Sequence, residues 1–200
     1  MSKEYWNNLY ASKETGWDIG YPAPAIKEYV DQLRDRTVPI LIPGCGNAYE
    51  AEYLLNQGFT NVTLIDIAPL VAQKLREKFM TDKTNSMTDK TNSIKIITGD
   101  FFELEGKYQL IIEQTFLSAL DPILRPKYVE KMHSLLFKGG HLAGVLFNKV
   151  FDEPGPPFGG TIEEYLPMFS SKFEVKQMEV CYNSIERRKG TEAFINLIAK

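Results

Sequence analysis

A short apolar run, a pair of glycines and a later carboxylate form the part of this chain best suited to bind a ligand. The run Ile40–Ile42 leads into Gly44-Cys45-Gly46, and Asp66 ends the next apolar run. A glycine turn between a strand and a helix presents backbone N–H groups to a ligand. An acid at the end of the following strand can accept hydrogen bonds from both hydroxyls of a ribose. The pattern therefore predicts a site for an adenosine cofactor.

The spacing of the glycines separates two classes of adenosine cofactor. A dinucleotide site has the pattern G-x-G-x-x-G, but Tyr49 stands at the third glycine position. The shorter turn fits S-adenosylmethionine, which has no pyrophosphate and whose carboxylate can lie at the helix N-terminus. We then expect Gly44 and Asp66 to bind the cofactor. Asp100 would contact the adenine amino group and Phe101 would pack on the ring, unless Asp66 and Asp100 only cap a helix and a turn.

Alternating strands and helices must position these residues. Strands are predicted over 38–42, 62–66, 94–98, 108–112, 141–147, 173–182 and 192–199, and helices over 26–33, 47–57, 69–79 and 126–137, with a further helix starting at a capping box at Thr161. Residues 1–21 are rich in aromatic side chains and are predicted to be irregular. The order predicts an α/β fold: a Rossmann-like, doubly wound, mostly parallel seven-stranded sheet with helices on both faces and an antiparallel C-terminal strand pair.

Two polar segments interrupt this pattern. Residues 80–86 are repeated unchanged as 87–93, and we interpret 80–93 as a duplicated surface loop, with a functional lid as the alternative. The charged segment 187–190 joins the last two strands. Its simplest interpretation is a solvated turn, and contact with an anion or a substrate is the alternative.

The bulk composition narrows the class of partner. Two hundred residues predict a single domain over 1–200, and the net charge of −3 argues against nucleic acid or an anionic membrane as the main partner. No apolar run is long enough to span a bilayer, and the N-terminus lacks the apolar core of a signal peptide. Two distant cysteines suggest neither a disulfide framework nor a zinc site. We expect a cytoplasmic protein, with a monomer as the default.

Motifs along most of the chain resemble the thiopurine, thiol and halide methyltransferase family of class I S-adenosylmethionine-dependent enzymes. The matching segments are Trp6, 17–20 with Pro24, 42–46, 66–67, 99–102, 121–126 and 155–158. The resemblance implies that Trp6, Tyr10 and Trp17, from an N-terminal arm and helix within 1–35, close over the cofactor. It also implies that Gln114 lines the cofactor pocket. Tyr10 stands where halide- and thiol-using relatives tend to have Trp, and Gln114 where they tend to have Tyr, which weakens the case for a halide acceptor.

Methyl transfer from a sulfonium is an in-line displacement that needs no nucleophile from the protein. A thiolate or halide acceptor hardly needs a base either, so positioning, desolvation and aromatic contacts supply most of the rate. We therefore predict no catalytic residue and no metal. The expected acceptor is a small soft nucleophile, most simply a thiol or thiopurine sulfur, with halide and thiocyanate as further candidates. Phe116, Asn148 and Phe158 are expected either to surround this acceptor or to serve core and loop packing.

Three other functions are compatible with parts of the pattern. An O- or N-methyltransferase of the same fold would need a general base that the sequence does not reveal. A nicotinamide-dependent oxidoreductase is disfavoured by Tyr49 at the third glycine position. A module that binds the cofactor without catalysis would keep the pocket and lack methyl transfer.

Overall fold

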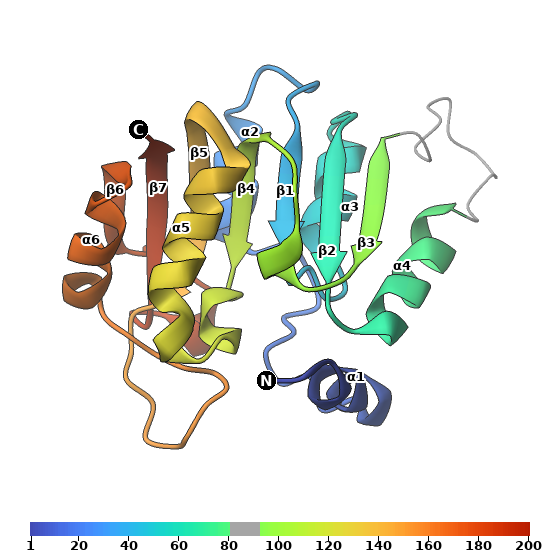
Figure 1. The fold of residues 1–200 in the computed structure, drawn as a ribbon, viewed down its shortest axis with the longest axis horizontal. Coiled ribbons are helices and arrows are strands. Elements are labelled where there is room, and N and C mark those ends of the chain that lie inside the picture. Colours follow the sequence, from blue (N-terminus) through green and yellow to red (C-terminus); the bar gives the residue numbers. More distant parts are fainter. Residues whose placement is uncertain (81–92) are drawn as a thin grey trace.

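A computed structural model describes residues 1–80 and 93–200, so nearly all of the duplicated segment 80–93 lies outside the described residues. Seven strands form one sheet in the order β3-β2-β1-β4-β5-β7-β6 (Figure 1). The strands are β1 Ile40–Pro43, β2 Val62–Asp66, β3 Ile94–Thr98, β4 Tyr108–Gln114, β5 Leu136–Phe147, β6 Phe173–Val180 and β7 Glu192–Ala199. β7 is antiparallel to both of its neighbours, and the remaining pairs are parallel. The predicted fold class is confirmed.

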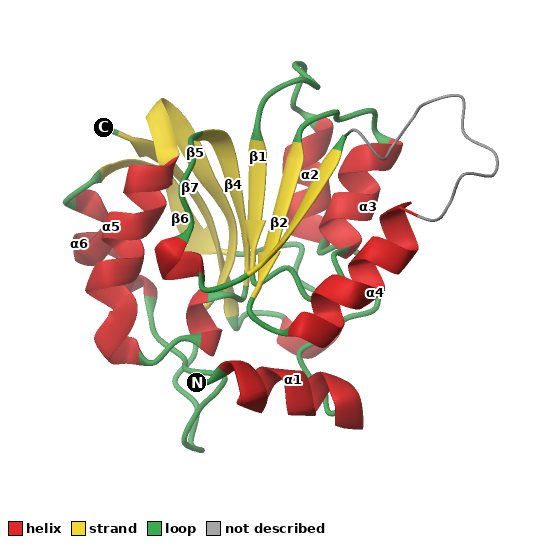
Figure 2. Cartoon of the chain, turned by 45° about the vertical axis from the view of Figure 1, so that its right-hand side comes forward, coloured by secondary structure: helices red, strands yellow, loops and turns green. Residues whose placement is uncertain are grey.

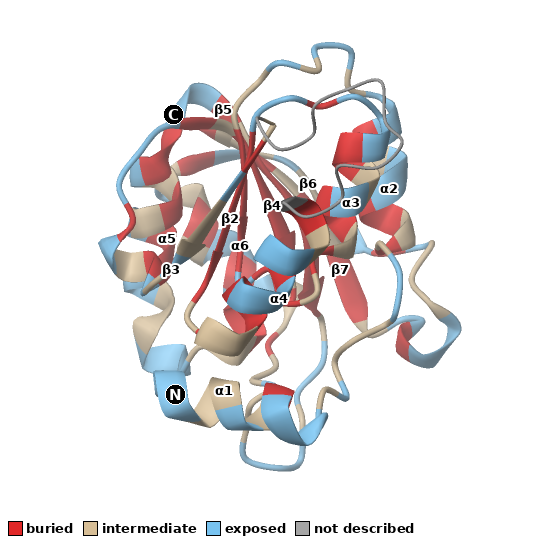
Figure 3. Cartoon of the chain, turned by 90° about the vertical axis from the view of Figure 1, so that its right-hand side faces the viewer, coloured by how far each residue is buried: buried red, intermediate tan, exposed pale blue. Residues whose placement is uncertain are grey.

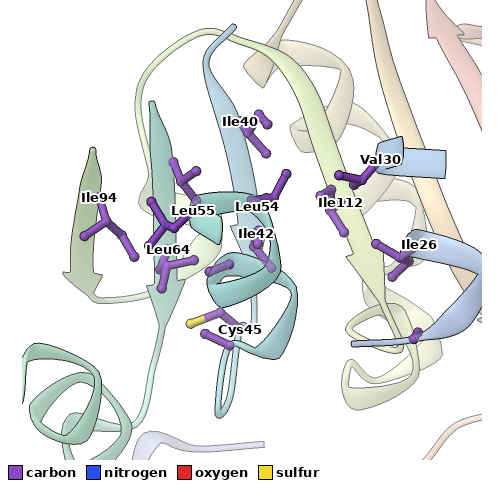
Figure 4. Close-up of a cluster of buried hydrophobic side chains, with 14 of the residues drawn as sticks. Ile26, Val30, Ile40, Ile42, Cys45, Leu54, Leu55, Leu64, Ile94 and Ile112 are labelled. Atoms are coloured by element: carbon purple, nitrogen blue, oxygen red, sulfur yellow. The ribbon is translucent and has the colours of Figure 1, made fainter. Parts of the chain in front are cut away.

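Helices cover both faces of this sheet (Figure 2). The α-helices are α1 Lys3–Ser12, α2 Pro24–Asp31, α3 Tyr49–Asn56, α4 Pro69–Met80, α5 Arg125–Leu135 and α6 Ile162–Ser170. Ile40 and Ile42 of β1 belong to the buried cluster that includes side chains of α2, α3 and α4 (Figure 4). Leu41, between them, belongs to the cluster that includes side chains of α5 and α6. The two-residue alternation of a strand thus fills both cores, and the strands form the buried centre of the molecule (Figure 3).

Local sequence explains where several helices begin and end. Gly58, with a φ of +85°, follows α3, and Pro69 opens α4, as the sequence predicts. The capping box at α6 is complete, because Thr161 and Glu164 each accept a hydrogen bond from the other's backbone N–H.

Two predicted segments differ from the structure. The region expected to be irregular contains α1, whose first turn is capped by the Ser2 hydroxyl accepting from the N–H of Tyr5 at 3.2 Å. The helix expected to reach Phe137 ends at Leu135, and β5 begins at once at Leu136. β5 starts early because its first residue pairs with Tyr108 of β4, ahead of a register irregularity in that pairing.

The carboxyl ends of β1 to β5 meet at one edge of the sheet, because these strands run parallel. α1 lies across this edge, and the connection between β5 and α6 extends past it as well (Figure 1). Within α1 only Tyr10 is buried. Its side chain belongs to the core cluster on the face of the sheet that is covered by α2, α3 and α4.

Candidate functional site

A cavity of about 590 Å³ opens at this edge of the sheet. All eight residues predicted to bind the cofactor line it: Trp6, Tyr10, Trp17, Gly44, Asp66, Asp100, Phe101 and Gln114. They come from α1 and the segment after it, from the ends of β1, β2 and β4, and from the residues that follow β3. We refer to the residues at and after the ends of β1, β2 and β3 as the β1–β3 wall. The residues at and after the ends of β4 and β5, together with the connection between β6 and β7, are the β4–β5 wall.

The glycine turn is required by close contacts as well as by its backbone shape. Gly44 and Gly46 have φ values of +55° and +50°, in the left-handed region that side chains disfavour. A Cβ on Gly44 would lie 2.3 Å from Cδ2 of Phe116. One on Gly46 would lie 2.8 Å from the hydroxyl oxygen of Tyr10. The two glycines therefore let one aromatic ring from each side of the cavity approach the turn.

Asp66 is held in one orientation by backbone groups. Its Oδ2 accepts from the N–H of Gly46 at 3.1 Å, and its Oδ1 accepts from the N–H of Ala68 at 2.9 Å. The residue is only 7% exposed, and this burial raises the pKa of the carboxyl while the backbone N–H donors counteract it. Because Ala68 directly precedes α4, the bond from its N–H means that Asp66 caps this turn in addition to any role in binding a ligand. A carboxylate oxygen has more than one lone pair, which leaves capacity for a hydroxyl donor.

The β3 end combines a capping acid with a buried ring. Asp100 Oδ1 accepts from the N–H of Phe102 at 2.8 Å, and so caps the 3₁₀ turn Phe101–Glu103. Phe101 is buried and meets Phe116 edge-on, with 5.1 Å between ring centroids. The two walls of the cavity therefore touch through these two rings.

The N-terminal arm contributes a cluster of aromatic rings. Trp17 meets Trp6 and Tyr10 edge-on, with centroid distances of 5.5 and 5.7 Å. The arm is tied to the body of the protein where Asn7 Oδ1 accepts from the N–H of Leu70, at the start of α4, at 3.0 Å. Edge-on packing leaves ring faces available, and ring faces attract cations.

The β4–β5 wall begins with a strained turn that the sequence does not reveal. Thr115 has a φ of +59°, an uncommon and costly conformation for a β-branched residue. Beneath it, the fully buried Glu113 accepts from the N–H groups of Phe116 and Leu117, at 2.5 and 3.1 Å, and from the hydroxyl of Tyr128. Burial raises the pKa of Glu113 to about 7, against the lowering effect of these donors.

Two cations and two rings complete this wall. Phe147 and Phe151 meet edge-on at 5.1 Å between centroids. The guanidinium of Arg188 lies 5.1 Å from the centre of Phe147, and Nζ of Lys149 lies 5.3 Å from that of Phe151. The four side chains line the cavity together with Phe116.

Asn148 and Phe158, expected either to surround the acceptor or to serve core and loop packing, are not among the residues that line this cavity. The Asn148 side chain accepts from the N–H of Ile162 at 3.0 Å and so supports the start of α6. Phe158 is half-buried, and its backbone N–H donates to the carbonyl of Ser118 at 2.7 Å. The prediction of a solvated turn at 187–190 is wrong for Arg188, which is 7% exposed and pairs with Glu192.

Two further searches were confined to the described residues. Within 1–80 and 93–200, His, Cys, Asp and Glu side chains form no group of three or more that could hold a metal ion. The same residues contain no helix with the length and hydropathy needed to cross a membrane.

The fold of this chain is similar to that of solved S-adenosylmethionine-dependent methyltransferases. The 1,6-didemethyltoxoflavin-N1-methyltransferase of Burkholderia thailandensis, solved with bound S-adenosylhomocysteine, matches this chain with a TM-score of 0.73 at 16% identity. The match covers 99% of this chain and 87% of that one. Identity this low shows a shared fold.

Sequence comparison identifies the family within this class. The family model of thiopurine S-methyltransferase (TPMT) matches residues 1–197. A thiopurine S-methyltransferase of Vibrio campbellii is 30% identical over 178 residues, covering 84% of this chain and 81% of that protein. A probable thiol methyltransferase 2 of Arabidopsis thaliana is 27% identical over 193 residues, covering 94% and 81%. The chain belongs to the thiopurine S-methyltransferase family, which confirms the predicted resemblance, and it is an S-adenosylmethionine-dependent methyltransferase.

Proposed function

We propose that this enzyme methylates the sulfur of a small thiol or thiopurine that binds as an anion against the β4–β5 wall. The observation that carries the proposal is the distribution of charge along the cavity. Among the described lining residues, every carboxylate belongs to the arm, the β1–β3 wall or the start of α3. The opposite side presents Lys149 and Arg188 above aromatic rings.

This arrangement suits a sulfur nucleophile that ionises readily. A nearby cation lowers the pKa of a thiol, so the acceptor can be bound as a thiolate without a base from the protein. An oxygen or nitrogen acceptor would need a base, and no carboxylate of the β4–β5 wall lines the described cavity. This is the reason for preferring sulfur over the O- or N-methyltransferase alternative.

The proposed cofactor contacts follow from the β1–β3 wall. Asp66, whose carboxylate is oriented by two backbone donors, is assigned to the ribose hydroxyls, and Asp100 and Phe101 are assigned to the adenine. Because Gly44 has no side chain, the cofactor can approach the backbone of the glycine turn closely. The volume of about 590 Å³ is within the range of small-molecule sites. When bound, S-adenosylmethionine supplies an electrophilic methyl group on a positively charged sulfur.

The protein's own contribution is orientation and exclusion of water. Trp6, Tyr10 and Trp17 are assigned to the cationic end of the cofactor, because ring faces attract positive charge. Gln114 lines the cavity and is assigned to the cofactor pocket. Phe116, whose ring meets that of Phe101, is assigned to aligning the acceptor with the methyl group. The acceptor's lone pair forms the new bond to carbon as the old carbon–sulfur bond breaks, so the protein moves no proton when the acceptor is already ionised.

We also propose the domain content, the oligomeric state and the cellular location of the enzyme. We infer a single domain over 1–200 that acts as a monomer on a small molecule. Cys45 and Cys181 are buried free thiols, which suits the reducing cytoplasm.

Transfer of radiolabelled methyl from S-adenosylmethionine to a panel of acceptors tests the proposal. The panel contains a thiol, a thiopurine, thiocyanate, iodide, a phenol and an amine. We expect transfer to the first two, with a rate that rises as the acceptor's thiol ionises. Transfer only to the phenol or the amine would contradict the sulfur assignment, and transfer to none would favour a module that binds without catalysis.

Calorimetry of S-adenosylhomocysteine binding tests the cofactor assignment separately. Asp66→Ala removes the only side chain assigned to the ribose, and we expect affinity to fall about a hundredfold, as for the loss of two charge-assisted hydrogen bonds. Thr63→Ala, which alters a buried polar residue on the same strand that is not among the lining residues, is the control for stability. Unchanged affinity in a folded Asp66→Ala protein would overturn the ribose assignment.

A further inference from the structure

Two distant parts of the chain bind the same dipeptide of the N-terminal arm. From the connection between β6 and β7, Nη2 of Arg188 donates to the carbonyl oxygen of Trp17 at 2.6 Å. Nη2 of Arg187 donates to the carbonyl oxygen of Asp18 at 2.8 Å. These bonds join residues near opposite ends of the sequence across the mouth of one cavity.

The other side of this dipeptide is bound by the start of α3. Oδ2 of Asp18 accepts from the side-chain amide of Asn47 and from the hydroxyl of Tyr49, the latter at 3.3 Å. Oδ1 accepts from the N–H of Gly20 at 2.7 Å, which keeps the carboxylate turned toward α3. Tyr49, the residue that replaces the third glycine of a dinucleotide site, thus has a partner of its own in the arm.

One donor on each side of the dipeptide, Arg188 and Tyr49, has further contacts of its own. Arg188 is 7% exposed, pairs with Glu192 at 3.1 Å and lies over the ring of Phe147. Nζ of Lys78 lies 5.4 Å from the ring centre of Tyr49. Because Arg188 and Tyr49 are held by partners of their own, their bonds restrain the arm.

We propose that Asn47, Tyr49, Arg187 and Arg188 form a clasp of positioning residues that keeps Trp17 and Asp18 closed over the cavity and sets how fast S-adenosylhomocysteine leaves. All six residues line the cavity, so a ligand beneath the arm is released when these bonds break. The attachment of Asn7 to Leu70 lies outside the clasp, so α1 stays in place while the Trp17 segment opens. The inference rests on the proposed cofactor site.

The composition of the chain supplies a reporter for this motion. The only two tryptophans are Trp6 and Trp17, and both belong to the arm and line the cavity. Tryptophan fluorescence, excited selectively over that of the ten tyrosines, therefore reports on the arm, with or without a ligand.

Arg187→Ala and Tyr49→Phe are the informative variants, because Arg187 is exposed and a phenylalanine keeps the ring beneath Lys78. Stopped-flow fluorescence would follow the release of S-adenosylhomocysteine on dilution. We expect release about threefold faster in each variant and about tenfold faster in the double variant, as for the loss of one or two net hydrogen bonds. Quenching of tryptophan by acrylamide should increase without ligand, and Arg187→Lys should restore part of the slow release.

Lys189→Ala is the matched control, since Lys189 is an exposed cation two residues after Arg187 and its ion pair is with Glu186. It should leave release and quenching unchanged. Wild-type release and quenching in the double variant would overturn the clasp, as would a loss of thermal stability with no change in release. Failure of the wild-type protein to bind S-adenosylhomocysteine would instead overturn the cofactor site, and the clasp with it.

Discussion

The β1–β3 wall and the β4–β5 wall of the cavity fix their side chains by different means. In the first, Gly44, Asp66 and Asp100 lie within two residues of a strand end, and both acids are oriented by neighbouring backbone N–H groups. In the second, the strained Thr115 is held from beneath by Glu113, a carboxylate with no exposure to solvent. The rest of that wall comes from loops and from the connection between β6 and β7.

The difference shows how one fold can keep a cofactor and change an acceptor. The bonds that orient Asp66 and Asp100 come from backbone groups of the turns that follow β1, β2 and β3, so they belong to the strand–turn–helix units of the fold. The β4–β5 wall combines local bonds to Glu113 with long-range contacts such as that of Arg188 with Trp17, and the long-range contacts can vary without disturbing the sheet. This fits the general observation that function lies in sites built upon folds.

The largest expected effect comes from a change that disrupts both walls. Gly44→Ala places a Cβ 2.3 Å from the ring of Phe116 and imposes a strained φ. We expect unfolding free energy to fall by about 4 kcal/mol and cofactor binding to be lost. Chemical denaturation and calorimetry measure the two effects.

The double variant Gly44→Ala/Phe116→Ala separates the two causes. Removing the ring relieves the clash but leaves the strained backbone, so part of the stability should return relative to Gly44→Ala. If Phe116→Ala restores none of the unfolding free energy lost in Gly44→Ala, the two walls do not meet at the contact between Gly44 and Phe116.

A smaller effect should appear in the pH dependence of stability. Burial raises the pKa of Glu113 from 4.5 to about 7 on folding, so between these values the folded protein keeps a proton that the unfolded chain has lost. Stability from this group is therefore greatest at low pH and falls as the pH rises through the window. The size is on the order of 3 kcal/mol at 1.36 kcal/mol per pKa unit. Glu113→Gln should flatten the curve measured by urea denaturation from pH 5 to 8.

Tyr128→Phe sharpens this prediction. The Tyr128 hydroxyl lowers the pKa of Glu113, so its removal should move the sloping region to higher pH. If unfolding free energy depended on pH with the same slope in wild type and in Glu113→Gln, this carboxyl would not contribute the pH dependence that we assign to the β4–β5 wall.

The smallest expected effect concerns the acceptor alone. Lys149→Ala removes an exposed cation of the β4–β5 wall, and we expect the KM for a thiolate acceptor to rise about threefold, as for a solvent-screened pair. Affinity for S-adenosylhomocysteine should not change. Steady-state kinetics at two salt concentrations measure the effect, which should shrink at high salt. A change in cofactor affinity instead would show that the walls are not separable.

The sequence predicts the sheet and one wall well, because both depend on local patterns. Apolar runs mark strands, and strand-end residues such as Gly44 and Asp66 have one place to go in a parallel sheet. α1 is missed because its aromatic residues line the cavity as well as packing on the core, although Ser2 and Glu4 are typical of a helix start.

The remainder depends on contacts between distant segments. Glu113 lies in an apolar run where nothing marks it as an acceptor of three hydrogen bonds, and Arg188 lies in a charged run typical of a turn. Asn148 and Phe158 lie near the edge of the sheet at which the cavity opens. However, the Asn148 side chain bonds to the start of α6, and the Phe158 backbone bonds to Ser118. Position along the chain places a residue near an edge and does not decide which way its side chain turns.

The backbone conformation of Thr115 links the stability of the protein to its selectivity for the acceptor. Its left-handed φ costs on the order of 1 kcal/mol or more, and the cost is offset by the bonds that hold the turn, including that from the Ser118 hydroxyl to its carbonyl at 2.6 Å. A glycine at this position would relieve the strain and make the turn pliable. An engineer who seeks thermostability here would thus obtain an enzyme of broader acceptor range, whereas one who seeks discrimination would keep the threonine.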